Sequence, residues 1–164
     1  MKKNLLIVAG VCWLAARLSV PCCSAAEEPK PIKIGAIFSV TGPASFLGAP
    51  EGKTAKMLVD KINASGGVLG QKLELIIKDS SGSPEKAVSF AKQLIEEDKV
   101  LAIIGPSTSG ETMQIKKLCE ENQMILVSCA AAEAIVNPVA KYVFKTPHAR
   151  REKKGTKIKI VLFL

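Results

Sequence analysis

The sequence predicts an α/β fold in which helices flank a parallel sheet on both faces. Short apolar runs rich in β-branched residues alternate with amphipathic helical patterns along residues 32–145, and this alternation is typical of βαβ units. Each run also ends in a loop of small residues, and the carboxyl ends of parallel strands share one edge of a sheet. A ligand is expected at these loops, which are residues 39–45, 79–83, 105–109 and 128–132.

The individual elements follow from local signals. The first helix ends at Gly66-Gly67, because glycine favours the position after a helix. Ser83 and Pro84 predict the start of the second helix, since serine is a preferred N-cap and proline a preferred first residue. The third helix is expected to bury Ile115, Leu118 and Cys119. Strands are expected at residues 32–38, 73–78, 100–104, 124–127 and 142–145.

The strongest single signal is the segment 102–110, where a strand passes through Gly105-Pro106 into a helix. Thr108 and Glu111 have the spacing of a capping box, which places the helix start here. Helix N-termini attract anions, so the segment predicts a seat for a small carboxylate or phosphate. A well-capped helix after a buried strand is the alternative. The candidate hydroxyls are those of Ser107, Thr108 and Ser109.

The first 26 residues predict a signal peptide. A basic start precedes an apolar core, residues 5–16, that is too short to span a bilayer, and Ser24-Ala25-Ala26 fits a cleavage site. We therefore expect a periplasmic protein that begins at Glu27. A lipid anchor on Cys22 or Cys23 is the alternative, although the residues before them fit that motif poorly.

The net charge of +8 does not indicate nucleic-acid binding. The signal peptide carries three positive charges, and residues 148–164 carry six against Glu152. Residues 27–147 hold fourteen basic and fourteen acidic side chains, without a basic stripe interleaved with aromatic residues. We therefore exclude nucleic acid as a partner.

The sequence indicates no metal or cofactor. His148 is the only histidine, and neither a Cys/His cluster nor a glycine-rich nucleotide motif is present. Export would allow a disulfide between Cys119 and Cys129. Because Cys119 falls on an apolar helix stripe and Cys129 in a loop, two buried thiols are expected instead.

The hydroxyl residues of the loops lack a catalytic base. Activation of a serine nucleophile needs an adjacent base, and the loops offer none. The chain is therefore expected not to be an enzyme. An exported serine hydrolase that uses Ser107 or Ser109 is the weaker alternative.

Four sequence motifs agree in order and spacing with those of one known family: residues 34–39 with 41–43, residues 62–70, residues 104–109 and residues 142–147. With these motifs the chain resembles the periplasmic leucine/isoleucine/valine-type substrate-binding proteins of ABC transporters. The resemblance implies one lobe of a type I periplasmic-binding fold, a small ligand that is usually an amino acid, and an ABC permease in the membrane as partner. A ligand-sensing receptor domain has the same fold and remains an alternative.

The resemblance also implies roles for individual residues. Ser109 stands where the family holds the ligand carboxylate, and the carbonyl of Ala130 where it accepts from the ligand ammonium. Ala132 stands where many members have a Thr or Ser, so one polar contact is missing. Phe46 and Leu47 are expected to form a wall of the site, with loop packing as the alternative.

The resemblance ends after Pro147, although family members are typically more than twice as long as this chain. We therefore expect a signal peptide at 1–26, an N-terminal ligand-binding lobe at 27–147, and a divergent basic tail at 148–164 in place of a truncated or deleted second lobe. The acidic second-lobe group that pairs with the ligand ammonium is then absent, and function is impaired.

Overall fold

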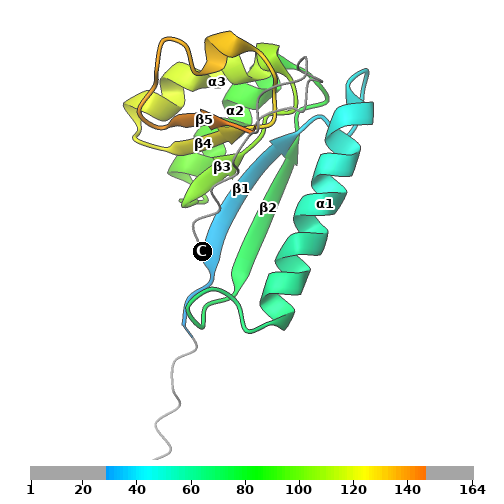
Figure 1. Ribbon diagram of the computed structural model, residues 1–164, viewed down its shortest axis with the longest axis vertical. Coiled ribbons are helices and arrows are strands. Elements are labelled where there is room, and N and C mark those ends of the chain that lie inside the picture. The colour runs from blue at the N-terminus through cyan, green and yellow to red at the C-terminus, as the bar shows by residue number, and fades with distance from the viewer. Residues whose placement is uncertain (1–28, 147–164) are drawn as a thin grey trace, which may run out of the picture.

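Five parallel strands form one sheet in the computed structural model, which describes residues 29–146 (Figure 1). The strand order is β2-β1-β3-β4-β5, and β1 and β2 project beyond the other three. The predicted α/β class is confirmed. The strands are β1 (Ile32–Phe38), β2 (Leu73–Asp79), β3 (Ala102–Ile104), β4 (Ile125–Ser128) and β5 (Val143–Lys145).

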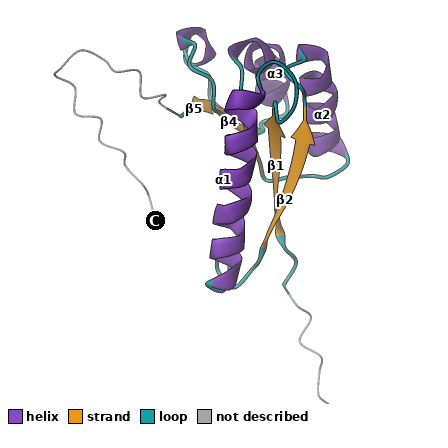
Figure 2. Cartoon of the chain, turned by 90° about the vertical axis from the view of Figure 1, so that its right-hand side faces the viewer, coloured by secondary structure: helices purple, strands orange, loops and turns teal. Residues whose placement is uncertain are grey.

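Helices cover the sheet from both sides (Figures 1 and 2). The chain moves from β1 outward to β2 and then returns past β1 to β3, so right-handed crossovers place the first helix opposite the next two. Accordingly, α1 contacts β1 and β2, whereas α2 packs against α3. The helices are α1 (Ser45–Ala64), α2 (Pro84–Glu96) and α3 (Ser109–Glu121), with a 3-10 turn at Glu133–Ile135 (η1).

The hydrophobic core lies between the sheet and the α2/α3 layer. Ile37, Ile103 and Leu126 point into it from three adjacent strands and are fully buried. Gly35 lets α2 approach β1, because a Cβ atom there would lie 2.9 Å from a methyl group of Leu94. Helix-side core residues are Ala87, Ala91, Leu94, Ile115 and Cys119.

The start of α2 agrees with its sequence signals. The Ser83 side chain accepts a hydrogen bond from the N–H of Lys86 at 3.3 Å, and Pro84 is the first helical residue. The third strand is shorter than predicted, covering residues 102–104. Leu118 is only partly buried, unlike Ile115 and Cys119.

Helix α1 begins at Ser45, the last residue of the predicted loop, and contains Pro50. Two glycines bring its first turns close to the end of β1. A Cβ atom on Gly48 would lie 2.3 Å from the Ser39 carbonyl oxygen, and Gly52 lies against Phe38. This close approach fixes the first turn of α1 at the carboxyl edge of the sheet.

Both cysteines of the described part, Cys119 and Cys129, are free thiols. Cys119 is fully buried, but Cys129 is partly exposed, which corrects the prediction of two buried thiols. Burial, together with the charge of Glu120, raises the pKa of Cys119 to about 12. Burial and the charge of Glu51 raise the pKa of Cys129 to about 11.

The predicted signal peptide, the candidate lipid-anchor cysteines, His148 and the predicted basic tail lie outside the described residues. Among residues 29–146, no helix is long and apolar enough to cross a membrane.

Candidate functional site

Hydrogen bonds join the loops at the carboxyl edge of the sheet. The N–H of Ser39, after β1, donates to the Ser107 hydroxyl at 3.1 Å. The N–H of Cys129, after β4, donates to the Pro106 carbonyl at 3.2 Å. The expectation that the strand-end loops share one edge of the sheet is thus confirmed.

The N-terminus of α3 is held by a capping box, as the sequence predicts. The Thr108 hydroxyl donates to the Glu111 carboxylate at 2.6 Å, and the Glu111 N–H donates back to that hydroxyl at 3.4 Å. Within the described residues, the N–H groups of Ser109 and Gly110 donate to no acceptor. These two groups are free to bind an anion.

Glu111 is completely buried beneath this helix start. One oxygen, Oε2, accepts from the Ser39 hydroxyl at 3.0 Å as well as from Thr108. The other, Oε1, has no partner among residues 29–146. The carboxylate therefore connects the loop after β1 to the loop before α3. The sequence indicated Glu111 only as a capping residue.

Ser107 and Thr108 use their hydroxyls inside the fold. Ser107 is buried, and its hydroxyl donates to the Glu51 carboxylate while it accepts from Ser39. The Thr108 hydroxyl is engaged in the capping box. Of the three candidate hydroxyls, the geometry therefore favours Ser109 as the one that contacts a ligand.

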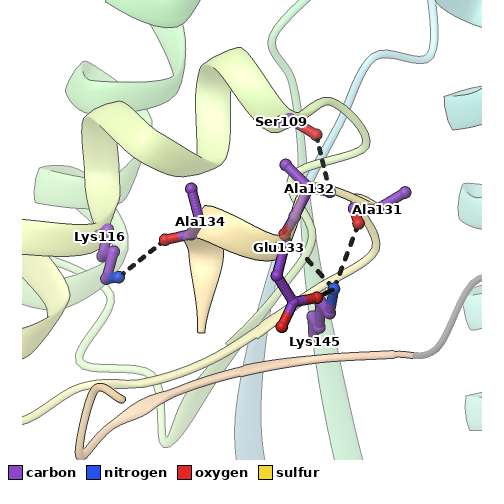
Figure 3. Close-up of polar contacts among 7 residues, drawn as sticks. All are labelled: Ser109, Lys116, Ala131, Ala132, Glu133, Ala134 and Lys145. Carbon is purple, nitrogen blue, oxygen red and sulfur yellow. Dashed lines mark hydrogen bonds and ion pairs between the residues drawn. The ribbon is translucent and has the colours of Figure 1, made fainter. Parts of the chain in front are cut away.

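Ser109 is the first residue of α3 and is partly exposed. Its Oγ accepts a hydrogen bond from the N–H of Ala132 at 3.3 Å, so the structure brings these two predicted residues together (Figure 3). This contact leaves the Ser109 O–H free to donate. The Ser109 hydroxyl and the N–H groups of Ser109 and Gly110 thus all belong to the first turn of α3.

Ala130 lies on the loop after β4 and is almost completely buried. Its N–H donates to the Ser128 hydroxyl at 3.1 Å, which is itself 2.8 Å from the Thr112 hydroxyl. Its carbonyl accepts no hydrogen bond from the described residues. This loop therefore holds one backbone acceptor that has no partner among the described residues.

Two lysines donate hydrogen bonds to backbone carbonyls of the same loop and of η1 (Figure 3). Lys145 Nζ lies 3.2 Å from the Ala131 carbonyl, 3.4 Å from the Ala132 carbonyl and 3.1 Å from the Glu133 carboxylate. Lys116 Nζ donates to the Ala134 carbonyl at 3.1 Å. The sequence analysis missed both lysines. The alternation along β5 could have found Lys145, because it places that residue on the same face as buried Val143.

The proposed wall residues lie in the first turn of α1 rather than in a loop. Phe46 is 74% exposed, so its ring is not needed for packing in this part of the chain. Leu47 is partly buried. A shallow groove of about 380 Å³ between α1 and β2 lies elsewhere, lined by Lys56, Val59, Asp60, Asn63, Leu73, Leu75 and Ile77.

Asp79, the last residue of β2, joins the loops after β1 and β2 through hydrogen bonds. Burial acts to raise the pKa of Asp79, but hydrogen bonds from the Thr41 hydroxyl, at 2.6 Å, and from the N–H groups of Ser81 and Thr41 bring it below 3.8. The carboxylate is thus ionised at neutral pH and ties the first two loops together. Within residues 29–146, no group of His, Cys, Asp and Glu has the arrangement of a metal site.

The fold is thus a parallel α/β sheet whose strand-end loops carry a hydroxyl, N–H groups and a carbonyl without partners among the described residues, and ligands of such sheets bind at this edge. The chain belongs to the periplasmic binding protein family, whose model matches residues 31–152.

Curated relatives agree with this family. A Leu/Ile/Val-binding protein, BraC3, of Rhizobium johnstonii is 35% identical over 100 residues, which are 61% of this chain and 27% of the relative. A leucine-, isoleucine-, valine-, threonine- and alanine-binding protein of Pseudomonas aeruginosa is 31% identical over 116 residues, covering 70% of this chain and 31% of the relative. The chain thus spans less than a third of the length of these relatives.

Solved structures show the same fold. The branched-chain amino acid transporter substrate-binding protein LivJ of Streptococcus pneumoniae, in complex with isoleucine, has a TM-score of 0.67 and 33% identity, covering 70% of this chain and 33% of LivJ. An ABC transporter solute-binding protein of Rhodopseudomonas palustris, in complex with 3,4-dihydroxybenzoic acid, has a TM-score of 0.63 and 25% identity. That match covers 70% of this chain and 31% of the relative.

Proposed function

We propose that this chain is a non-enzymatic, extracytoplasmic solute-binding component of an ABC importer, and that it seats the carboxylate of a branched-chain amino acid or a related small acid. The observation that carries the proposal is the presence of three donors without an acceptor in the first turn of α3, within the described residues: the Ser109 hydroxyl and the N–H groups of Ser109 and Gly110. Three donors at a helix N-terminus suit the two oxygens of a carboxylate.

The chemistry of the relatives' ligands supports this class. Isoleucine and 3,4-dihydroxybenzoic acid, which are named with two of the similar structures, share a carboxylate. Isoleucine also has an ammonium group, for which the carbonyl of Ala130 is the proposed acceptor. Because Ala132 has no side-chain hydroxyl, the ammonium receives fewer contacts here than the carboxylate. Phe46 and Leu47 are proposed to supply an apolar wall.

Export and a membrane partner complete the proposal. The signal-like residues 1–26 and the family match both favour delivery of solute to an ABC permease from the periplasm. N-terminal sequencing of the exported protein is expected to start at Glu27. A chain that still begins at Met1, or one lipidated on Cys23, would contradict this route.

The test of the binding site compares ligands with and without a carboxylate. In ¹H–¹⁵N NMR titrations, isoleucine is expected to shift the amide signals of Ser109 and Gly110, whereas isoleucinol, which lacks the carboxylate, leaves them unchanged. Ser109→Ala is expected to remove the shifts. Ser65→Ala, at the far end of α1, is the matched control and should keep them. Equal shifts with isoleucinol would overturn the proposal.

Absence of catalysis is tested separately. The contact of Ser109 within the described residues is a backbone N–H, which cannot accept the hydroxyl proton. An esterase, amidase and phosphatase screen is expected to give background rates. Turnover that disappears in Ser109→Ala would favour the hydrolase alternative instead.

A further inference from the structure

One face of the sheet is apolar and only partly covered. Strand alternation places five apolar side chains on the side away from α2 and α3, because their neighbours Ile103, Leu126 and Val143 point into the core. On this side the only described helix is α1, which contacts β1 and β2. We call these five residues the open sheet face: Ala102, Ile104, Ile125, Val127 and Phe144.

The exposure of this face is unusual for a parallel sheet. Strands of such sheets are normally buried on both faces, which is why they are apolar throughout. Here Ile125 is 40% exposed and Phe144 is 51% exposed, while the other three residues are partly buried. A contiguous apolar patch on a folded protein marks a contact surface.

The chain carries a segment whose composition suits this face. Residues 158–164 read Ile-Lys-Ile-Val-Leu-Phe-Leu and hold six apolar side chains, whereas the preceding residues 148–157 are polar and basic. Apolar side chains such as those of residues 158–164 lower the free energy when they are removed from water. Contact between this segment and the open sheet face would remove apolar surface of both from water.

The connection is long enough for contact within one chain. Eleven residues, 147–157, separate Thr146 from Ile158, and an extended chain spans roughly 3.3–3.6 Å per residue, or about 35–40 Å. The three strands of the open sheet face are only about 10 Å across, since neighbouring strands lie about 4.8 Å apart. The short connection also gives the segment a high effective concentration at the face, which favours it over a second molecule.

We propose that residues 158–164 pack on the open sheet face of their own chain. The role of this segment is independent of the ligand site, because the face lies on the strands and not on the loops that carry Ser109. The segment takes the place of a covering layer for β3, β4 and β5.

The experiment is site-specific photo-crosslinking on the purified protein with residues 147–164 present. Phe144, which is half-exposed and therefore tolerant of change, is replaced by benzoylphenylalanine and irradiated. Trypsin releases residues 160–164 as one peptide after Lys159, so mass spectrometry identifies its crosslink. We expect this crosslink within single chains, with a yield that does not depend on protein concentration. The same label at Leu69, which is 97% exposed in the turn before β2, is the control and should not capture the peptide.

A second variant guards against accidental capture. Leu162→Asp is expected to lower the Phe144 crosslink at least fivefold and to raise 8-anilinonaphthalene-sulfonate fluorescence at least twofold, whereas Thr156→Asp leaves both unchanged. Crosslinked dimers would show that a second copy covers the face, and would overturn the proposal. A Phe144 label that captures other peptides, or a Leu162→Asp variant that behaves like the unmodified chain, would overturn it as well.

Discussion

The Ser109 Oγ lies 3.3 Å from the backbone nitrogen of Ala132, whose N–H donates to it. This bond uses a lone pair of the hydroxyl oxygen and so directs the O–H away from Ala132. Because the donor is a backbone N–H, this hydrogen bond forms although Ala132 has no side-chain hydroxyl. The loops before α3 and after β4 are thereby joined at the proposed ligand site.

Replacement of Glu111 is expected to lower the free energy of unfolding. In Glu111→Ala, the buried Ser39 hydroxyl and both donors of Thr108 lose their acceptor, and each unsatisfied buried group costs about 1–3 kcal/mol. We expect urea denaturation to show a loss of about 3 kcal/mol. Glu111→Gln keeps one acceptor oxygen and should lose less.

Glu121→Ala is the matched control for this experiment. Glu121 belongs to the same helix and pairs with Lys117 at the surface, where such pairs contribute little. Its loss is expected to be below about 0.5 kcal/mol. Equal losses for Glu111→Ala and Glu121→Ala would show that the buried connection between the loops is unimportant.

Lys145 is expected to stabilise the loop of residues 131–133. Lys145→Met removes one ammonium from two carbonyls and a carboxylate, and a hydrogen bond with a charged donor contributes about 1.5–3 kcal/mol at most. Because Glu133 and Ala131 are exposed, we expect a net loss of about 1 kcal/mol in urea. Lys145→Arg should recover at least half of it. A Lys145→Met variant as stable as the unmodified protein would contradict this role.

The two thiols predict a decline of stability at alkaline pH. Both native pKa values, about 12 for Cys119 and about 11 for Cys129, lie above the ordinary 9.0, mainly because of burial. Above pH 9 the unfolded chain therefore releases protons that the native state retains, so the free energy of unfolding falls as pH rises. The slope approaches about 1.4 kcal/mol per pH unit for each thiol.

Denaturation curves between pH 8 and 10.5 measure this decline. A variant with Cys119→Ala and Cys129→Ala is less stable at pH 8 but should lose less stability on alkalinisation, since the two proteins differ only in these thiols. Iodoacetamide should also modify Cys129 before Cys119 in the native state, because Cys129 is the more exposed. Parallel curves for the two proteins would argue against the raised pKa values.

The sequence predicted the features that depend on neighbouring residues. The Ser83 cap, Pro84 at the start of α2 and the Thr108–Glu111 capping box are set by spacings of one to three residues. The order of strands and helices followed from hydrophobic periodicity in the same way. Family resemblance then indicated Ser109 and Ala132, which the structure brings together.

Other features depend on contacts between distant segments. The length of β3 is set by its pairing with β1 and β4, and the start of α1 by the fit of Gly48 against Ser39. The bond from Ser107 to Glu51 joins residues that are 56 apart in the chain. No local sequence pattern predicts such pairs. The sequence alone therefore places Ser107 among the candidate ligand hydroxyls, although its hydroxyl forms hydrogen bonds within the fold.

The strength of ligand binding follows from how much of the ligand this lobe encloses. Binding sites normally bury roughly 70–90% of a ligand, whereas the described residues supply one wall. If half of the polar contacts are missing, at about 1.5–3 kcal/mol each, affinity falls by several powers of ten, because about 1.4 kcal/mol is a factor of ten.

Isothermal titration calorimetry with isoleucine, leucine and valine is the most direct test of the central claim. We expect binding with a Kd no tighter than about 1 mM for the chain and no detectable binding for Ser109→Ala. Micromolar binding that persists in Ser109→Ala would show that the ligand does not rest on the start of α3, and would contradict the account.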